Sequence, residues 1–195
     1  MHVDVQIAAG HSLDVIAQVE TLSPFAKPIG SDYARYTAGT AMLETAERLV
    51  AEEGEPAVPH FLLLLGGLRA LAEGAHEPTL VLDSFLLRAL AISGYAPSFD
   101  ACARCGAAGP HRNFSAGAGG ILCNTCRLPG SARPPLEVVV LLGGLLAGDW
   151  ETVESVEVRF RKPASGIVAA YLQWHLERSL RSLPYVEREP PVVAR

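Results

Sequence analysis

The sequence lacks any apolar run long enough to cross a membrane. Its longest runs, Phe61 to Leu65 and Val138 to Leu142, end at Gly-Gly pairs and fall well short of the roughly 20 residues that a spanning helix needs. The N-terminus has no basic segment that leads into an apolar one, so no secretory signal is visible and the cytoplasm is the expected compartment. Cysteine is also scarce, and four cysteines in a reducing compartment favour metal binding over disulfides.

Signatures of several common enzyme classes are missing. The chain contains no His-Glu-x-x-His metalloprotease motif, no Gly-x-x-x-x-Gly-Lys phosphate loop and no Gly-x-Ser-x-Gly nucleophile elbow. The dinucleotide fingerprint fails as well, because Gly117-x-Gly119 is followed by Leu122 where the third glycine should stand. We therefore expect a protein that is not an enzyme.

Extensive disorder is excluded by the composition. Of 195 residues, 49% are hydrophobic, which is enough apolar material for one compact domain or two small ones. The formal net charge of −5 averages over an uneven distribution. Residues 1–100 carry 5 Lys or Arg against 13 Asp or Glu, whereas residues 101–136 carry four arginines and no acidic residue. A polyanion is therefore expected to approach the middle segment or the C-terminal arginines, and to be repelled by the first half.

The apolar pattern predicts one β-hairpin followed by helices. Val3, Val5 and Ile7 alternate with polar residues, so residues 2–7 and 13–22 are predicted to pair as two strands. Two strands are not stable alone, and this hairpin needs a larger sheet or helices beside it. Helices are predicted over 32–53 (with Tyr33, Tyr36, Met42 and Leu49 inside), 61–72, 79–93, 136–147 and 164–183 (with an apolar stripe from Val168 to Leu183).

Two further stretches are less distinctive. Residues 153–162 alternate weakly and fit either a strand or a poor helix. The pentapeptide Leu-Leu-Gly-Gly-Leu occurs at 64–68 and again at 141–145, but the flanking residues do not match. We therefore interpret the pair as two helices that need small residues for close packing, and not as an internal repeat.

Paired cysteines form the strongest chemical pattern. Cys102-x-x-Cys105 is followed, after 17 residues, by Cys123-x-x-Cys126, a spacing typical of a structural zinc site. Each pair can make a tight turn that aims both thiolates at one ion. Four thiolates leave Zn²⁺ no open position for water, so the metal is expected to organise the chain and not to catalyse. A redox pair is disfavoured because the thioredoxin-type motif needs a βαβ setting that is absent here.

Arginines around the cysteines admit two roles. They can neutralise the formally negative zinc-thiolate cluster, or they can face outward and hold phosphates. Composition favours neither role, and both can hold at once. The candidates for phosphate contacts are Arg104, Arg112, Arg127, Arg159, Arg161 and Lys162, and Arg133 belongs to the same basic segment.

Aromatic side chains also flank the cysteine pairs. Tyr95, Phe99 and Phe114 could stack on unpaired bases, but the commoner fate of such residues is a small core under the metal. We favour the small core.

The order of these motifs resembles a known family. The segment from Pro78 to Tyr95, the two cysteine pairs, and the segment Tyr171 to Leu183 (Tyr-Leu-x-x-His-Leu-Glu-Arg-x-Leu-Arg-Ser-Leu) together resemble the bacterial recombination mediators of the RecO family, in their zinc-containing form. The resemblance covers nearly the whole chain. It implies an N-terminal oligonucleotide-binding (OB) barrel, a helical domain and a zinc-bearing insertion.

The same resemblance implies partners and an activity. It implies binding of single-stranded and duplex DNA, annealing of complementary strands, and help in loading recombinase during gap repair. The partners it implies are RecR, the C-terminal tail of the single-stranded-DNA-binding protein and, indirectly, RecA, at the nucleoid in the cytoplasm.

The predicted fold class is α+β, mostly helical, with a four-cysteine zinc hairpin and a partial OB-type β segment. Residues 1–28 would supply the last strands of the barrel, and residues 29–195 the helical domain with the zinc-binding insertion at about 96–135. An OB barrel has five strands, so about three are lacking. A start codon placed too late, a fragment, or substitute pairing would each account for this.

Two other functions remain open. The chain could be a protein-interaction scaffold that does not bind DNA and whose zinc site is purely structural, or, less favoured, a metal-dependent transcription regulator. Salt-dependent retention on single-stranded DNA separates the mediator from the scaffold, and a sequence-specific duplex footprint would support the regulator.

Overall fold

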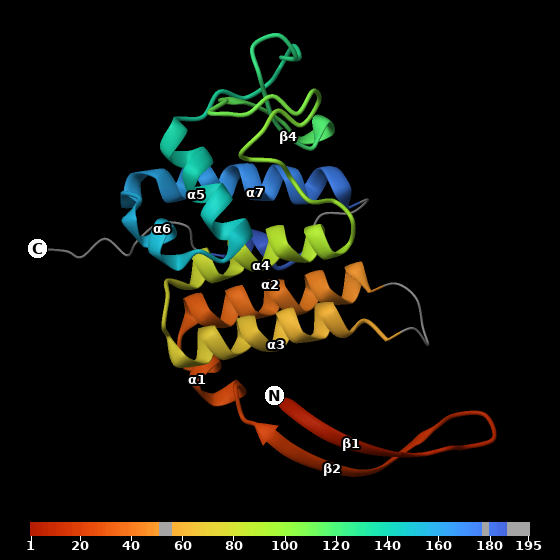
Figure 1. Cartoon of the computed structure of the whole chain (residues 1–195). Helices are drawn as coiled ribbons and strands as arrows, with labels where there is room; N and C mark the ends of the chain where they lie inside the picture. The colour runs from red at the N-terminus through yellow and green to blue at the C-terminus, as the bar shows by residue number, and fades with distance from the viewer. Residues whose placement is uncertain (51–55, 177–179, 187–195) are drawn as a thin grey trace, which may run out of the picture.

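The computed structural model describes residues 1–50, 56–176 and 180–186. A β-hairpin extends from one end of a helical body, and a small cysteine-bearing hairpin lies at the opposite end (Figure 1). The predicted mixture of many helices with little sheet is confirmed. The elements are β1 (His2–Ala8), β2 (Val15–Ser23), α1 (Ala26–Gly30), α2 (Tyr33–Leu49), α3 (Val58–Glu73), α4 (Pro78–Ile92), β3 (Asn113–Ser115), η1 (Ala116–Ala118), β4 (Gly120–Leu122), α5 (Leu136–Ala147), α6 (Trp150–Ser155), η2 (Val158–Phe160), α7 (Arg161–His175) and η3 (Leu183–Tyr185).

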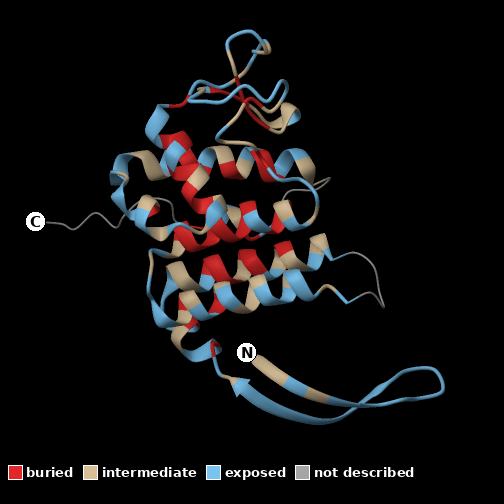
Figure 2. Ribbon diagram, in the orientation of Figure 1, coloured by how far each residue is buried: buried red, intermediate tan, exposed pale blue. Residues whose placement is uncertain are grey.

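Helix α4 forms the centre of the body. Its leucines, among them Leu82, Leu86 and Leu90, are fully buried, and burial extends around most of the helix. A helix that is apolar on all sides is stable only when other elements surround it. Helices α2 and α3 cover one side of α4, and α5 and α7 cover the other (Figures 1 and 2).

Local sequence signals set the ends of the helices. The Asp32 carboxylate accepts a hydrogen bond from the backbone N–H of Arg35 at 2.9 Å, which caps α2. Pro78 begins α4, and Gly74 ends α3 in the left-handed region at φ 69°. The predicted starts of α2 and α4 are thus confirmed within one residue.

The repeated pentapeptide marks close packing between helices. A Cβ atom added to Gly67 would collide with the Met42 side chain of α2, and one added to Gly144 would lie 3.1 Å from Val153 of α6. The glycine before Gly67, in contrast, has no neighbour within 4 Å of such an atom. This supports the interpretation that each copy needs a small residue at one contact.

Several expectations on the helices were wrong. Tyr33 and Tyr36 are each 55% exposed, because α2 buries its small residues and Met42 against the neighbouring helices instead. Residues 153–162 are neither one strand nor one helix but the end of α6, the turn η2 and the start of α7. The last helix ends at His175 and not at Leu183; its predicted continuation at 177–179, like residues 51–53 of the first helix, lies outside the described residues.

The N-terminal hairpin has an apolar face that the described residues leave open. Val5 pairs with Val19 and Ile7 with Ile16 in an antiparallel register, which confirms the predicted hairpin. Ile7, Ile16 and Val19 are more than half exposed. Among the described residues, no third strand pairs with β1 or β2. The described residues therefore leave most of the apolar side of this amphipathic hairpin uncovered.

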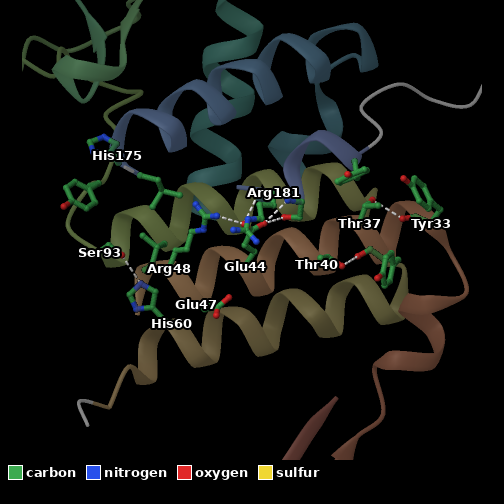
Figure 3. Close-up of a pocket in the computed structure, with 16 residues that line it drawn as sticks. Tyr33, Thr37, Thr40, Glu44, Glu47, Arg48, His60, Ser93, His175 and Arg181 are labelled. Atoms are coloured by element: carbon green, nitrogen blue, oxygen red, sulfur yellow. Dashed lines mark hydrogen bonds and ion pairs between the residues drawn. The ribbon is translucent and has the colours of Figure 1, made fainter. Parts of the chain in front are cut away.

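Glu44 of α2 fastens the C-terminal segment to the helical body. Its carboxylate accepts hydrogen bonds from the backbone N–H groups of Arg181 and Ser182, both at 2.8 Å, and from the Ser182 hydroxyl at 2.5 Å. The Arg48 guanidinium donates a further bond at 2.6 Å (Figure 3). Burial opposes ionisation, but these donors outweigh it and lower the pKa of Glu44 to about 2.

Glu44→Gln is expected to destabilise the protein by about 2 kcal/mol at pH 7, because the folded state holds this carboxylate in its ionised form. The side chain is only 16% exposed, so solvent screening is limited. Since the folded pKa lies below the usual 4.5, this contribution is complete above pH 4.5 and is lost as the pH falls towards 2.

Urea unfolding at pH 7, 4.5 and 2.5 measures the difference between the two proteins. The difference should shrink across this series. Glu47→Gln, on the same helix but exposed, is the matched control and should change little. A difference that does not vary with pH would contradict the assignment.

Among the described residues, no helix combines the length and the apolar character that crossing a membrane requires.

Candidate metal centre and basic hairpin

The two cysteine pairs are brought together by backbone hydrogen bonds. The N–H of Gly106 donates to the carbonyl of Cys102 at 2.8 Å, which closes the first knuckle. The N–H of Ala103 donates to the carbonyl of Ile121 at 2.8 Å, and so ties the first knuckle to β4, the strand that leads into the second. Strands β3 and β4 pair antiparallel between the knuckles.

The four cysteine sulfur atoms form one compact cluster. All four lie within 4.8 Å of one another, and the sulfur atoms of Cys105 and Cys123 are 3.9 Å apart. A tetrahedral Zn²⁺ with zinc–sulfur bonds of about 2.3 Å requires sulfur atoms about 3.8 Å apart. The donor set and its spacing therefore fit a metal ion of this kind.

The electrostatics of the cluster also favour a cation. A hydrogen bond from the backbone N–H of Cys123 lowers the pKa of Cys102 to about 6. A hydrogen bond shared with the Cys105 sulfur raises the pKa of Cys126 to about 12. Four thiols this close cannot all ionise by themselves, because the negative charges repel one another. A divalent ion would allow all four to bind as thiolates.

The hairpin packs on α7 through aromatic rings. Phe114 is buried, lies 6.3 Å from the Phe99 ring and meets the edge of Tyr171 at 6.1 Å. Burial raises the pKa of Tyr171, whose hydroxyl donates to the backbone carbonyl of Tyr95 at 3.1 Å. The predicted core under the metal is confirmed for Phe99 and Phe114, and it is continuous with the core of the helical body.

Three of the predicted phosphate contacts lie on this hairpin. Arg104, Arg112 and Arg127 are exposed, as is Arg133. The Nε–H of Arg112 donates to the carbonyl of Pro134 at 3.2 Å. Within the described part of the chain, no carboxylate forms an ion pair with these arginines. Their guanidinium groups are thus available to an anion.

The other three candidates lie elsewhere. Arg159 lies in η2, and Arg161 and Lys162 are the first residues of α7, whereas the hairpin packs on the C-terminal half of that helix. With a rise of about 1.5 Å per residue, the two ends of this helix are roughly 20 Å apart. Arg159 is paired with Glu157 at 2.9 Å, and the Nε atom of Arg161 is buried without a hydrogen-bond partner among the described residues. The six candidates therefore come from two elements of the fold, the cysteine-bearing hairpin and the η2–α7 junction, and their part in phosphate binding stays a prediction.

Sequence reasoning missed Trp174 on the last turn of α7. This side chain is 65% exposed and lies against the backbone of Gly117 in η1. A signal was present, because Trp174 falls outside the apolar stripe that Val168 and Leu172 form on the same helix. A tryptophan on the polar side of a helix needs an explanation other than the core.

A groove runs along the helical body and reaches Tyr95 and His175 near the end of α7. It has a volume of about 1570 Å³ and runs along α2, between the ends of α4 and α7 and the C-terminal segment (Figure 3). Its lining includes Tyr33, Tyr36, Arg48, Arg181 and Tyr185. The tyrosines that were expected in the core thus line this groove.

Comparison with known proteins identifies the family. Residues 30–184 match the family described as "Recombination protein O C terminal". The chain is 63% identical over 190 residues to the DNA repair protein RecO of Nocardioides sp. (strain ATCC BAA-499 / JS614), covering 96% of this chain and 78% of that protein. It is 59% identical over 193 residues to the DNA repair protein RecO of Streptomyces avermitilis, and 57% identical over 187 residues to that of Thermobifida fusca, again over 96% of this chain and over 78% and 77% of those proteins. The chain therefore belongs to the RecO family of DNA repair proteins.

Proposed function

We propose that the chain is a DNA-repair mediator without enzymatic activity, which binds single-stranded and duplex DNA, anneals complementary strands and helps to load recombinase in gap repair. One observation carries the proposal. Exposed arginines surround a four-cysteine cluster on a hairpin whose segment, residues 101–136, contains no acidic residue. Family membership in DNA repair agrees with this role.

The proposed mechanism is electrostatic. Arginine guanidinium groups neutralise phosphates and release counterions from the DNA, so binding weakens steeply as salt rises. Phosphate contacts carry no sequence information, and two strands held side by side can therefore pair. Zn²⁺ bound by Cys102, Cys105, Cys123 and Cys126 would hold both knuckles in place, and it would leave no coordination position for catalysis.

Charge reversal of two hairpin arginines tests the proposal. Arg104→Glu with Arg127→Glu should weaken binding to single-stranded DNA at least tenfold and flatten the salt dependence, because each lost phosphate contact removes about 0.7 from the slope of log K against log salt. Fluorescence anisotropy with an oligothymidine at several salt concentrations measures both quantities. Metal content should stay unchanged.

Lys27→Glu with Arg69→Glu is the matched control. It changes the net charge by the same amount, at exposed positions of the acidic half. Unchanged affinity in the hairpin variant would assign the arginines to charge balance of the cluster alone. It would then favour the alternative function, an interaction scaffold with a purely structural zinc site.

The proposed partners are RecR, the C-terminal tail of the single-stranded-DNA-binding protein and, indirectly, RecA. The groove along α2 supports a site for the tail, because tyrosines and Arg181 suit an acidic segment that ends in an aromatic residue. The open apolar face of β1 and β2 supports the assignment of residues 1–28 to a partial OB-type barrel.

A further inference from the structure

Trp174 presents a large aromatic surface beside the basic hairpin. It is the last but one residue of α7 and is 65% exposed, although tryptophan is the largest apolar side chain. The other tryptophan of the chain, Trp150, lies parallel to the His76 ring at 3.8 Å and is half-buried. Tryptophan is therefore not exposed everywhere in this chain, and the exposure of Trp174 arises from its position at the end of α7.

The backbone of η1 supports this indole. A Cβ atom added to Gly117 would lie 2.7 Å from Cζ2 of Trp174 and 3.2 to 3.3 Å from two further ring atoms. Only glycine allows the ring to approach so closely. One side of the indole thus rests on the hairpin, and much of the rest of the ring faces solvent.

Two further rings lie near the same end of α7. His175 follows Trp174 in the chain, and its ring lies 4.5 Å from that of Tyr95, which is 45% exposed. Arg112 stands directly before β3, the three-residue strand that leads into η1. The local charge is positive, because the four arginines of residues 101–136 exceed the formal charge of −2 of four thiolates with a divalent ion.

We propose that Trp174 is a stacking platform for an unpaired base of single-stranded DNA. The inference rests on the proposed function and adds to it a residue that distinguishes single strands from duplexes. Exposed aromatic rings near phosphate-binding cations are the usual way in which proteins hold unpaired bases without reading their sequence. Bases in a duplex are stacked on their neighbours and are not available to the indole.

Trp174 fluorescence reports such contact directly. In a Trp150→Phe protein, Trp174 is the sole tryptophan, and phenylalanine keeps a ring against His76. Oligothymidine should quench its emission in a saturable way as a base stacks on the indole. A duplex of equal length, bound to saturation as judged by anisotropy, should leave the emission nearly unchanged.

Affinity measurements with variants of the otherwise native chain complete the test. Trp174→Ala should weaken binding of oligothymidine about 5- to 150-fold without changing the salt slope, since stacking is worth about 1–3 kcal/mol and releases no counterions. Trp174→Phe should restore most of the affinity. Phe61→Ala, which removes a half-exposed ring from α3 on the opposite side of α4, is the control and should bind as the native protein does.

The outcomes separate this inference from the proposed function. Normal binding by Trp174→Ala with no quenching would overturn the inference, while the arginine variants would still show whether the hairpin binds DNA. If Trp174→Ala lost equal affinity for single strands and for duplexes, or lost its bound metal, Trp174 would only support the hairpin. Either result would overturn the inference. Loss of binding to a partner protein with unchanged DNA affinity would assign Trp174 to a protein interface and would also overturn the inference. No DNA binding by the native protein at any salt would reject the proposed function itself.

Discussion

Cys105→Ser is expected to abolish tight metal binding and to unfold the hairpin between residues 96 and 135 while α4 stays folded. Changes to groups that merely orient metal ligands cost about 10- to 100-fold in metal affinity, so loss of a ligand should cost more than about 100-fold. The free energy of binding a structural Zn²⁺, about 10–16 kcal/mol, is largely the folding free energy of such modules. Strands β3 and β4 have three residues each and cannot replace it.

Metal content and hydrogen exchange measure this result. Chelator competition gives the affinity, and exchange of the amides of residues 101–127 compared with those of α4 locates the unfolding. Thr125→Ser is the matched control, because this exposed residue lies between Cys123 and Cys126 without being a predicted ligand. A variant that keeps its metal yet melts throughout would contradict the predicted role of the cluster.

Tyr171→Ala should be the most damaging single change in the contact between the hairpin and the helical body. Tyr171 is only 1% exposed and packs its edge against Phe114. Removal of a buried aromatic side chain costs about 3–5 kcal/mol through lost burial and the cavity that remains. In a chain of this size, that loss corresponds to a decrease of roughly 6–20 °C in the melting temperature.

Two matched variants separate packing from hydrogen bonding at this position. Tyr171→Phe keeps the ring and removes only the bond to the carbonyl of Tyr95, which should cost about 1 kcal/mol. Tyr33→Ala removes a tyrosine that is mostly exposed and should cost less than about 0.5 kcal/mol. Calorimetry on the native protein and the three variants tests this order of stabilities. A Tyr171→Ala protein as stable as Tyr33→Ala would show that the hairpin does not depend on this contact.

The features predicted correctly are those whose causes are local in sequence. Two residues between cysteines make a knuckle wherever the knuckle is placed, so the cluster of Cys102, Cys105, Cys123 and Cys126 followed from spacing alone. Alternation predicted the hairpin, and Asp32 and Pro78 predicted the start of two helices, because a cap acts on the N–H groups within one turn of it.

The errors arose where the environment comes from distant segments. Tyr33 and Tyr36 were expected inside because they are apolar rings on a helix, but the neighbouring helices pack on the small residues and Met42 of that helix. The end of α7 was placed too late, because the leucine stripe continues beyond His175. Beyond the helix, the N–H groups of Arg181 and Ser182 donate to Glu44, a residue more than 130 positions away.

The sequence by itself determined that a four-sulfur cluster forms in a basic, acid-free segment beside a largely helical body, since spacing and local charge require no knowledge of the fold. Only the tertiary structure decided which side chains around that cluster remain available to a ligand. It placed three of the six predicted phosphate contacts on the cysteine-bearing hairpin and three in η2 and the first turn of α7, and it placed Trp174 on Gly117 at the surface. The physical reason is that exposure depends on what packs against a residue, and those neighbours come from segments that are remote in the sequence.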